Sequence, residues 1–311
     1  MWFSTFVYYM TRCRGRYDVV VAEGFGGSRV PRLSPLYVTE PMITEWHQIH
    51  RDLFAVQYPR LMNPALNLLE RATAWVHRDT LVRAGTEDWR RNFTKFGFRP
   101  ANVFVLPVSI RDERLERSSG GPSTEPRILW LGKLRRYKCP DHAVRAMKAV
   151  LEHVPEARLT IAGRRDDLKY EAELRALARE LGIEKSVDFR FDLTENEKWD
   201  LIRASRILVV TSAVEGFGIV VLEANAYGIP VVASTGVPEG AVQDGGNGLR
   251  YPFGDVPALA KKLSQLLQDG ELYSRLSQNA SKGVEQYRWT RVGAEFERVV
   301  SSAAARAGSR R

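Results

Sequence analysis

The stretch TSAVEGFGIVVLEANAYGIPVVAS, Thr211 to Ser234, decides the fold of this chain. The apolar run ILVV leads into it, a Gly-Phe-Gly loop follows, and VVAS forms a second apolar strand after Gly-Ile-Pro. The residues between the loop and Gly228 have the length of a short helix. Near-continuous apolar strands joined by helices are typical of a parallel sheet covered on both faces. We therefore expect a doubly wound α/β domain with its ligand site at the carboxyl ends of the strands.

The loop in this stretch has the features of an anion site. A helix that begins near Phe217 presents the backbone N–H groups of Gly218 and Ile219 at its first turn, where the helix dipole favours negative charge. Glu223 lies one turn beyond Ile219 on the same face, and Glu215 lies in the loop. N–H donors suit phosphates and carboxylates suit hydroxyl groups, so the combination favours a nucleotide attached to a sugar.

Length and composition indicate the broad class of protein. The 311 residues allow one large domain or two of ordinary size. A hydrophobic fraction of 44% and a charged fraction of 27% are typical of a soluble globular protein. Two cysteines, Cys13 and Cys139, give no disulfide framework and favour a reducing compartment, so we expect a cytoplasmic protein. Every apolar run is strand-sized and too short to span a membrane.

The chain begins with the aromatic segment MWFSTFVYYM, which has no basic region before it and is a poor signal peptide. One interpretation is the buried end of a helix. The other is an interfacial segment, with Arg12, Arg14 and Arg16 beside it, which would give a peripheral membrane contact.

The net charge is +9, and residues 1–112 hold 15 Lys+Arg against 10 Asp+Glu, or +5 of that excess. This balance favours nucleotide phosphates or an anionic lipid surface as partners, although the same charge also serves solubility. No nucleic-acid motif is visible, so we expect no nucleic-acid partner.

Changes in pattern along the chain predict its organisation. Charges followed by Ser, Gly and Pro in RDERLERSSGGPSTEP mark a linker. After it, apolar strands alternate with amphipathic helices. The expected strands lie at 17–24, 80–85, 103–108, 127–132, 158–163, 186–191, 206–212 and 230–234, with one more ending at His47. The expected parts are an incomplete Rossmann-like domain at 1–112, the linker at 113–126, a complete Rossmann-like domain at 127–285, and a helix with a basic tail at 286–311.

A second strand end carries positive charge. Gly132, Lys133 and Lys138 follow or end the strand RILWLG. A glycine at a strand end lets a diphosphate approach the backbone, and lysines neutralise its charge. Alone, this loop is equally well explained as a solvated basic segment. If this loop lies beside the loop of Glu215, charged residues from two strand ends face one crevice.

These stretches together resemble the retaining glycosyltransferases of the group 1 family, which have the GT-B fold and use nucleotide-activated sugars. The resemblance covers 127–300 and extends more weakly back to about Tyr17. It rests on WLGKLRRYKCPDHAVRAM, EGFGIVVLEANAYGIPVVAS, VQDGGNGLRYPFGD and YRWTRVGAEF. It implies two Rossmann-like domains facing a cleft, a closing helix that returns to the first domain, and hexose transfer with retention of configuration.

The resemblance also implies roles for individual residues. Lys133 and Lys138 would hold the donor diphosphate, and Glu223 would bind the ribose hydroxyls. Glu215 would contact the transferred sugar, near the N–H groups of Phe217, Gly218 and Ile219. His47 would face the sugar and acceptor from the first domain, with a structural strand-end histidine as the alternative. His50 is expected at the surface.

Several residues depart from the family pattern. Lys133 replaces an arginine, and Cys139 replaces a glycine. The opening strand, Gly-Gly loop and first helix of the family have no counterpart, so the first domain is expected to lack its first part.

The resemblance also bears on cofactors and partners. The chain contains no Asp-x-Asp, which agrees with a metal-independent reaction and no cofactor. The expected partners are a nucleotide-sugar donor and a glycan or lipid-linked acceptor. The alternatives are a nucleotide-sugar epimerase or hydrolase on the same fold, and an inactive nucleotide-sugar-binding or scaffold protein.

Overall fold

The computed structural model describes residues 2–25, 32–116 and 123–308. The chain divides into two compact units. Unit 1 combines Met1–Val108 with Trp289–Arg311, and unit 2 is Ser109–Arg288. The expected linker at 113–126 lies partly outside the described residues, since 117–122 are not described, and so does the end of the basic tail at 309–311. Among the described residues, no helix combines the length and apolar character needed to cross a membrane.

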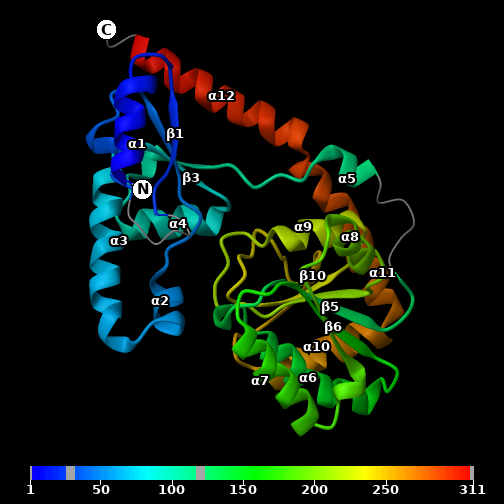
Figure 1. Ribbon diagram of the computed structural model, residues 1–311. Helices are drawn as coiled ribbons and strands as arrows, with labels where there is room; N and C mark the ends of the chain where they lie inside the picture. The colour runs from blue at the N-terminus through cyan, green and yellow to red at the C-terminus, as the bar shows by residue number, and fades with distance from the viewer. Residues whose placement is uncertain (1, 26–31, 117–122, 309–311) are drawn as a thin grey trace. The chain divides into compact units, whose positions relative to one another are not determined.

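Unit 1 is built on a parallel sheet of four strands in the order β1-β2-β3-β4 (Figure 1). The strands are β1 Val20–Glu23, β2 Met42–Glu45, β3 Leu81–Ala84 and β4 Val103–Val105. The helices of this unit are α1 Trp2–Tyr8, α2 Arg51–Gln57, α3 Asn63–His77, α4 Glu87–Phe96 and α12 Trp289–Gly308. Its core is aromatic: the buried Trp46 ring lies 5.0 Å from the ring of Phe98 and 6.2 Å from that of Phe25.

Local signals define α4 within unit 1. Thr86 caps its start by accepting a hydrogen bond from the backbone N–H of Trp89, and Gly97 ends it with φ of +122°. These are the preferred residue types for the two ends of a helix, so local sequence is sufficient to define α4.

The aromatic start of the chain forms a helix whose described side chains are largely exposed. Phe6, Val7 and Tyr8 are all exposed, and among residues 4–10, whose burial is described, only Tyr9 is buried. The Phe6 ring contacts the edge of Tyr37 at a centroid distance of 5.2 Å, which covers it only in part. The interpretation of this segment as a buried helix end is therefore wrong for these three side chains.

Unit 2 contains six parallel strands in the order β10-β9-β8-β5-β6-β7. The strands are β5 Arg127–Lys133, β6 Arg158–Arg164, β7 Val187–Phe191, β8 Ile207–Val210, β9 Val231–Ser234 and β10 Gly248–Tyr251. The helices are α5 Asp112–Glu116, α6 Pro140–His153, α7 Leu168–Glu180, α8 Glu195–Arg203, α9 Ile219–Ala226, α10 Val256–Gln268 and α11 Gly270–Gly283. Helices α6, α7 and α10 lie on one side of the sheet, and α8 and α9 lie on the other (Figure 1).

The order of these strands positions the candidate site. Strands β5 and β8 are neighbours, although 73 residues separate the end of β5 at Lys133 from the start of β8 at Ile207. The strand order reverses between them, and such a switch point is where doubly wound sheets bind ligands. The predicted α/β class with two Rossmann-like units is confirmed.

Candidate functional site

The loops that follow β5 and β8 are joined by hydrogen bonds. Ala213 donates its backbone N–H to the carbonyl of Tyr137 at 2.8 Å. The hydroxyl of Thr211 donates to the carbonyl of Lys138 at 2.7 Å and accepts from the indole N–H of Trp130 at 3.0 Å. Thr211 and Trp130 are buried, so these bonds fix the Lys138 loop to the end of β8. The structure thus brings together the two loops that the sequence placed at one crevice.

Lys138 and Glu215 form an ion pair between Nζ and Oε1. Ser212 adds a hydrogen bond from its hydroxyl to the same carboxylate oxygen at 2.8 Å. The side chains of Lys138 and Glu215 are 17% and 11% exposed, so the pair is partly shielded but open to a ligand. A cation and a carboxylate that share one opening provide separate partners for a phosphate and for sugar hydroxyls.

Gly236 holds the loop of Glu215 from the other side. Its carbonyl accepts the backbone N–H of Glu215 at 3.0 Å. A Cβ atom at Gly236 would lie only 2.3 Å from the carbonyl oxygen of Ala213 and 2.4 Å from that of Ser212. Because these neighbours are backbone atoms, no side chain can be accommodated without moving the loop. Glycine at 236 therefore sets the position of Glu215, a feature that the sequence analysis missed.

The first turn of α9 presents backbone donors. Gly218 precedes this helix with φ of +90°, a conformation that favours glycine, and no side chain caps the helix. Within the described chain, no acceptor takes the N–H groups of Phe217, Gly218 or Ile219. Phe217 is buried with its ring 5.5 Å from that of Tyr287, whereas Ile219 is exposed. The packing of Phe217 anchors the turn and leaves its N–H groups available to an anion.

Glu223 is nearly buried and is paired with a residue that the sequence analysis missed. Lys198 on α8 contacts Oε1 of Glu223 at 2.9 Å and Oε1 of Glu195 at 3.1 Å. Burial raises the pKa of the Glu223 carboxyl, and the hydrogen bond from Lys198 opposes that shift. Lys198 gave no signal in the sequence because it lies on a different helix, 25 residues away.

Lys133 ends β5 as an exposed side chain, and no carboxylate pairs with it among the described residues. Gly132 beside it closely approaches the neighbouring strand. A Cβ atom at Gly163, where φ is +134°, would lie 1.9 Å from the carbonyl oxygen of Gly132. The backbone at Gly132 is therefore placed by contact with β6.

In unit 1, His47 lies two residues beyond the end of β2, and its side chain is exposed. His50 is buried, so the prediction of a surface position for His50 is wrong. Its backbone N–H donates to both carboxylate oxygens of Glu70, at 2.9 and 3.2 Å, and its ring Nδ1 lies 2.8 Å from Oε1. The burial of His50 follows from this fully buried carboxylate on α3.

One cluster has ligand types that suit a metal ion. The ligand atoms of Cys139, Asp141 and His142 lie within 4.8 Å of one another. The hydroxyl of Tyr170 already donates to Asp141 at 2.6 Å, and burial raises the pKa of the Cys139 thiol to about 12. A metal needs the thiolate, which this environment disfavours. Cys139 has φ of +47°, a left-handed conformation that explains why a glycine is typical here in the family resembled.

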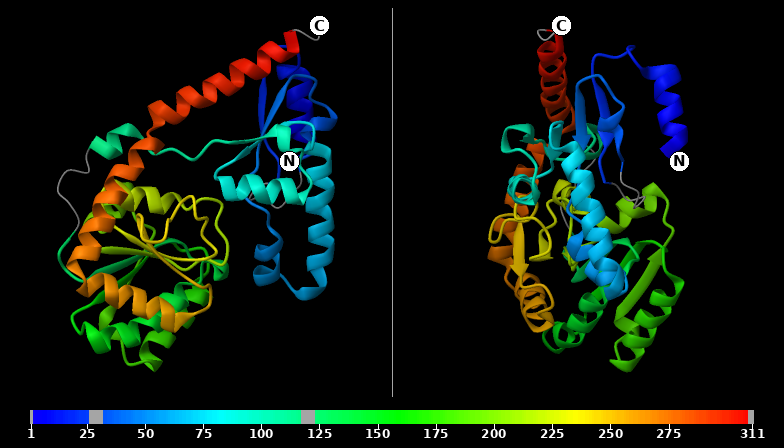
Figure 2. Two further views of the ribbon diagram at one scale, coloured as in Figure 1. Left: turned by 180° about the vertical axis from the view of Figure 1, so that it is seen from behind. Right: turned by 90° about the vertical axis from the view of Figure 1, so that its left-hand side faces the viewer.

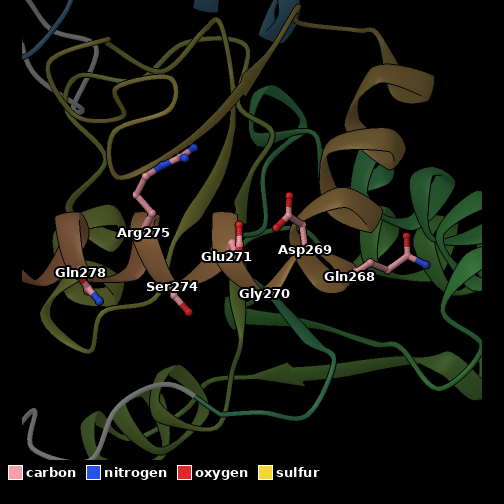
Figure 3. A pocket seen from close by; sticks show the side chains of 7 residues that line it. All are labelled: Gln268, Asp269, Gly270, Glu271, Ser274, Arg275 and Gln278. Atoms are coloured by element: carbon pink, nitrogen blue, oxygen red, sulfur yellow. The ribbon is translucent and has the colours of Figure 1, made fainter.

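A shallow hollow of unit 2 is lined by residues outside these loops (Figure 3). It has a volume of about 810 Å³ and is lined by the end of α10 and one side of α11. The lining residues are polar apart from Gly270 and are Gln268, Asp269, Gly270, Glu271, Ser274, Arg275 and Gln278. None of the candidate site residues lines it.

A doubly wound parallel sheet, with a lysine–glutamate ion pair and unbonded backbone N–H groups at its switch point, defines unit 2 as a Rossmann-like unit. More specifically, the chain belongs to the glycosyl transferases group 1 family, whose model matches residues 111–283.

Two relatives in sequence carry the name D-inositol 3-phosphate glycosyltransferase. The protein of Streptomyces bingchenggensis is 29% identical over 242 residues, covering 72% of this chain and 53% of the relative. That of Corynebacterium aurimucosum is 32% identical over 241 residues, covering 72% of this chain and 57% of the relative. The chain thus spans somewhat more than half the length of these two relatives.

Solved structures of similar fold include HepE of Anabaena in complex with UDP and glucose. That structure has a TM-score of 0.71 and 18% identity, covering 92% of this chain and 78% of HepE. Sucrose-phosphate synthase of Thermosynechococcus elongatus has a TM-score of 0.74 and 19% identity, covering 96% of this chain and 76% of the synthase. At these identities the likeness is one of fold.

Proposed function

We propose that this chain transfers a hexose from a nucleotide-sugar donor to an acceptor hydroxyl, with retention of anomeric configuration. The observation that carries the proposal is the presence of three groups on the loop after β8 and the helix that follows it, one of them tied to the loop after β5. These are the ion pair of Lys138 with Glu215, the unbonded N–H groups before α9, and the nearly buried carboxylate of Glu223. Family membership supports the same reaction class.

Each group has a distinct role in the proposal. Lys138, assisted by Lys133, neutralises the diphosphate, and the N–H groups of Phe217, Gly218 and Ile219 bind its oxygens. These preorganised donors stabilise the charge that develops on the leaving diphosphate. Glu215 accepts hydrogen bonds from hydroxyls of the transferred sugar and holds the anomeric carbon near the acceptor. Glu223 binds the ribose, and Lys198 keeps its carboxylate charged.

The proposed donor contacts require no metal ion or cofactor. Lysines and a helix N-terminus supply the positive potential that a divalent cation supplies elsewhere. His47 is proposed to face the acceptor from unit 1, and its exposed position after β2 leaves it accessible. The proposed acceptor is a glycan or a lipid-linked sugar, reached by a cytoplasmic protein in peripheral contact with the membrane.

Calorimetry with uridine, guanosine and adenosine diphosphates tests the donor site on the whole chain. We expect one of them to bind, with Lys138→Met and Glu223→Gln each weakening binding by about 1–3 kcal/mol, the range for a lost charged hydrogen bond. Lys282→Met is the control, because Lys282 is an exposed lysine on α11. Equal binding by wild type and both site variants would contradict the assignment.

Turnover separates a transferase from a binding protein. With the sugar donor that carries the bound nucleotide, Glu215→Gln is expected to lower kcat more than it lowers diphosphate affinity. Because two relatives are named for D-inositol 3-phosphate, that compound is a rational first soluble acceptor to assay beside lipid-linked glycans. The anomeric proton coupling in the product reports retention. Tight nucleotide binding without transfer to any acceptor would favour the inactive binding protein instead.

A further inference from the structure

Helix α3 has an apolar face that is exposed. Leu61, Leu68 and Trp75 are 94%, 69% and 62% exposed, and they recur every seven residues, which is two helical turns. Leu61 lies in the 3-10 turn Arg60–Met62 that leads into α3. Met62 and Leu69 flank this row and are also exposed. We call this row, from Leu61 to Trp75, the α3 stripe; Figure 2 (right) shows α3 running along the outside of unit 1.

The opposite face of α3 is polar, and its groups are bonded inside unit 1. The carboxylate of Glu70 is bound to His50, as described above. The Nδ1 atom of the His77 ring lies 3.0 Å from the hydroxyl of Thr44. Its Nε2 donates a hydrogen bond to the carbonyl of Arg32 at 2.5 Å. An ordinary surface helix buries its apolar residues and exposes its polar ones. Helix α3 does the reverse, so its outer face is better suited to an apolar neighbour than to water.

The charged residues within the stripe segment are basic apart from one, and the next residue along the chain, Asp79, pairs with Arg78 at 3.5 Å. From Pro59 to Arg78 the basic residues are Arg60, Arg71 and Arg78, and the single acidic residue is the fully buried Glu70. The guanidinium of Arg78 lies over the ring of Trp75, with its carbon 4.6 Å from the ring centroid. The accessible surface of this segment therefore combines leucines, a tryptophan and positive charge. That composition is typical of helices that lie in the interface of an anionic bilayer.

We propose that the α3 stripe is the surface by which this protein binds an anionic lipid bilayer, with Leu61, Leu68 and Trp75 inserted below the headgroups. Tryptophan suits this depth because its ring is apolar and its N–H is polar. Arg60 and Arg71 pair with lipid phosphates. The proposal deepens the peripheral membrane contact proposed above and locates it on α3 rather than on the aromatic start of the chain. Its test uses no sugar donor, so its failure leaves the transferase proposal intact.

Sedimentation of the whole chain with vesicles tests the proposal. One set of vesicles contains phosphatidylcholine with 30% phosphatidylglycerol, and the other contains phosphatidylcholine alone. We expect binding to the anionic set that weakens with salt, and at least a tenfold loss of partitioning in Leu68→Ser/Trp75→Ser. The matched control is Leu168→Ser on α7 of unit 2, where the leucine is similarly exposed at 70%. Because all three positions are exposed, none of these changes disturbs a core, and thermal unfolding of each variant verifies this.

Two further variants locate the contact. Arg60→Gln/Arg71→Gln is expected to remove the salt sensitivity of binding, and Tyr8→Ser on α1 is expected to leave partitioning unchanged. Loss of binding in Tyr8→Ser with full binding in the stripe variant would transfer the contact to α1. Absence of wild-type binding to anionic vesicles would overturn the proposal. The proposal would also be overturned if sedimentation velocity showed a dimer for the wild type and a monomer for Leu68→Ser/Trp75→Ser. A second copy of the chain would then cover the α3 stripe.

Discussion

Glu70 on α3 accepts three hydrogen bonds from His50: two from its backbone N–H, at 2.9 and 3.2 Å, and one from its ring Nδ1 at 2.8 Å. Both residues are buried, and they are 20 positions apart in the chain. The pair holds the segment after β2, which also carries the exposed His47. The position of His47 thus depends on a carboxylate that does not itself reach the surface.

Replacing Glu70 by alanine is expected to destabilise unit 1 by about 2–3 kcal/mol, because the buried donors of His50 lose their acceptor. Urea unfolding followed by tryptophan fluorescence measures the effect. Glu87→Ala is the control, since Glu87 forms an exposed pair with Arg90, and it should leave the midpoint unchanged. Equal midpoints for Glu70→Ala and wild type would show that the pair does not stabilise the fold.

Gly236→Ala is expected to weaken nucleotide binding without a change at any proposed contact residue. The added methyl group would approach the carbonyl oxygens of Ser212 and Ala213 to less than 2.5 Å, so the loop of Glu215 must move. A loss of tenfold or more in diphosphate affinity by calorimetry is the expected result. Gly270→Ala provides the comparison, since a methyl group at Gly270 meets no atom within 4 Å. Unaltered affinity in Gly236→Ala would mean that the loop adapts freely.

Lys198 and Glu223 are expected to be energetically coupled. Lys198→Met leaves a nearly buried carboxylate without its cation, so the pKa of Glu223 rises further and unit 2 loses about 1–3 kcal/mol at neutral pH. Lys198→Met/Glu223→Leu should recover most of that loss, because an apolar pair of similar volume avoids the desolvation of charge. A double-mutant cycle from chemical unfolding at pH 7 yields the coupling, and strictly additive effects would contradict it.

His77 makes the stability of unit 1 depend on pH. Burial lowers the pKa of its imidazole, and the bond to the carbonyl of Arg32 opposes this. A base whose pKa is lower in the folded state than in the unfolded state contributes stability above the unfolded pKa of about 6.5, and that contribution is lost as the pH falls through the folded value. The stability difference between wild type and His77→Gln should therefore narrow from pH 8 towards pH 5. A difference that stays constant over this range would argue against a buried neutral imidazole.

Cys139 is expected to be inert towards thiol reagents in the folded protein. Burial raises the pKa of its thiol to about 12, so roughly one molecule in ten thousand carries the reactive thiolate at pH 8. Cys13 is only partly buried. Ellman's reagent should therefore titrate one thiol per chain in native buffer and two in guanidinium chloride. Cys13→Ser should abolish the native reaction, and a fast second thiol in the native protein would contradict the buried position of Cys139.

The strands and helices that the sequence predicted best are those defined by local patterns. The apolar strands from 127 to 234 need only near neighbours in the chain to be recognised, and each of them was found. Strand β10 was missed because GLRY is short and follows Gly-Gly-Asn, and pairing with β9 is what orders it. Helix α2, Arg51–Gln57, was missed for a similar reason, since it lies among residues without a clear helical period.

In the candidate site too, the features that follow from local sequence were predicted and those that depend on distant contacts were not. The pairing of the loops of Lys138 and Glu215 could be inferred because parallel strands end at one edge of a sheet. Lys198 and Gly236 could not be inferred, because their importance arises from contacts with residues distant in sequence. His50 was placed wrongly because nothing near it in the sequence indicates that Glu70 accompanies it into the interior.

The division of the chain between the units bears on the order in which the protein folds during synthesis. Unit 2 is one continuous segment, Ser109–Arg288, whereas unit 1 needs α12, which is made after all of unit 2. Domains generally fold as units while the chain emerges from the ribosome. Unit 2 can therefore reach its native state while unit 1 still lacks its last helix. Met1–Val108 must therefore wait for its last helix until the whole of unit 2 has been synthesised.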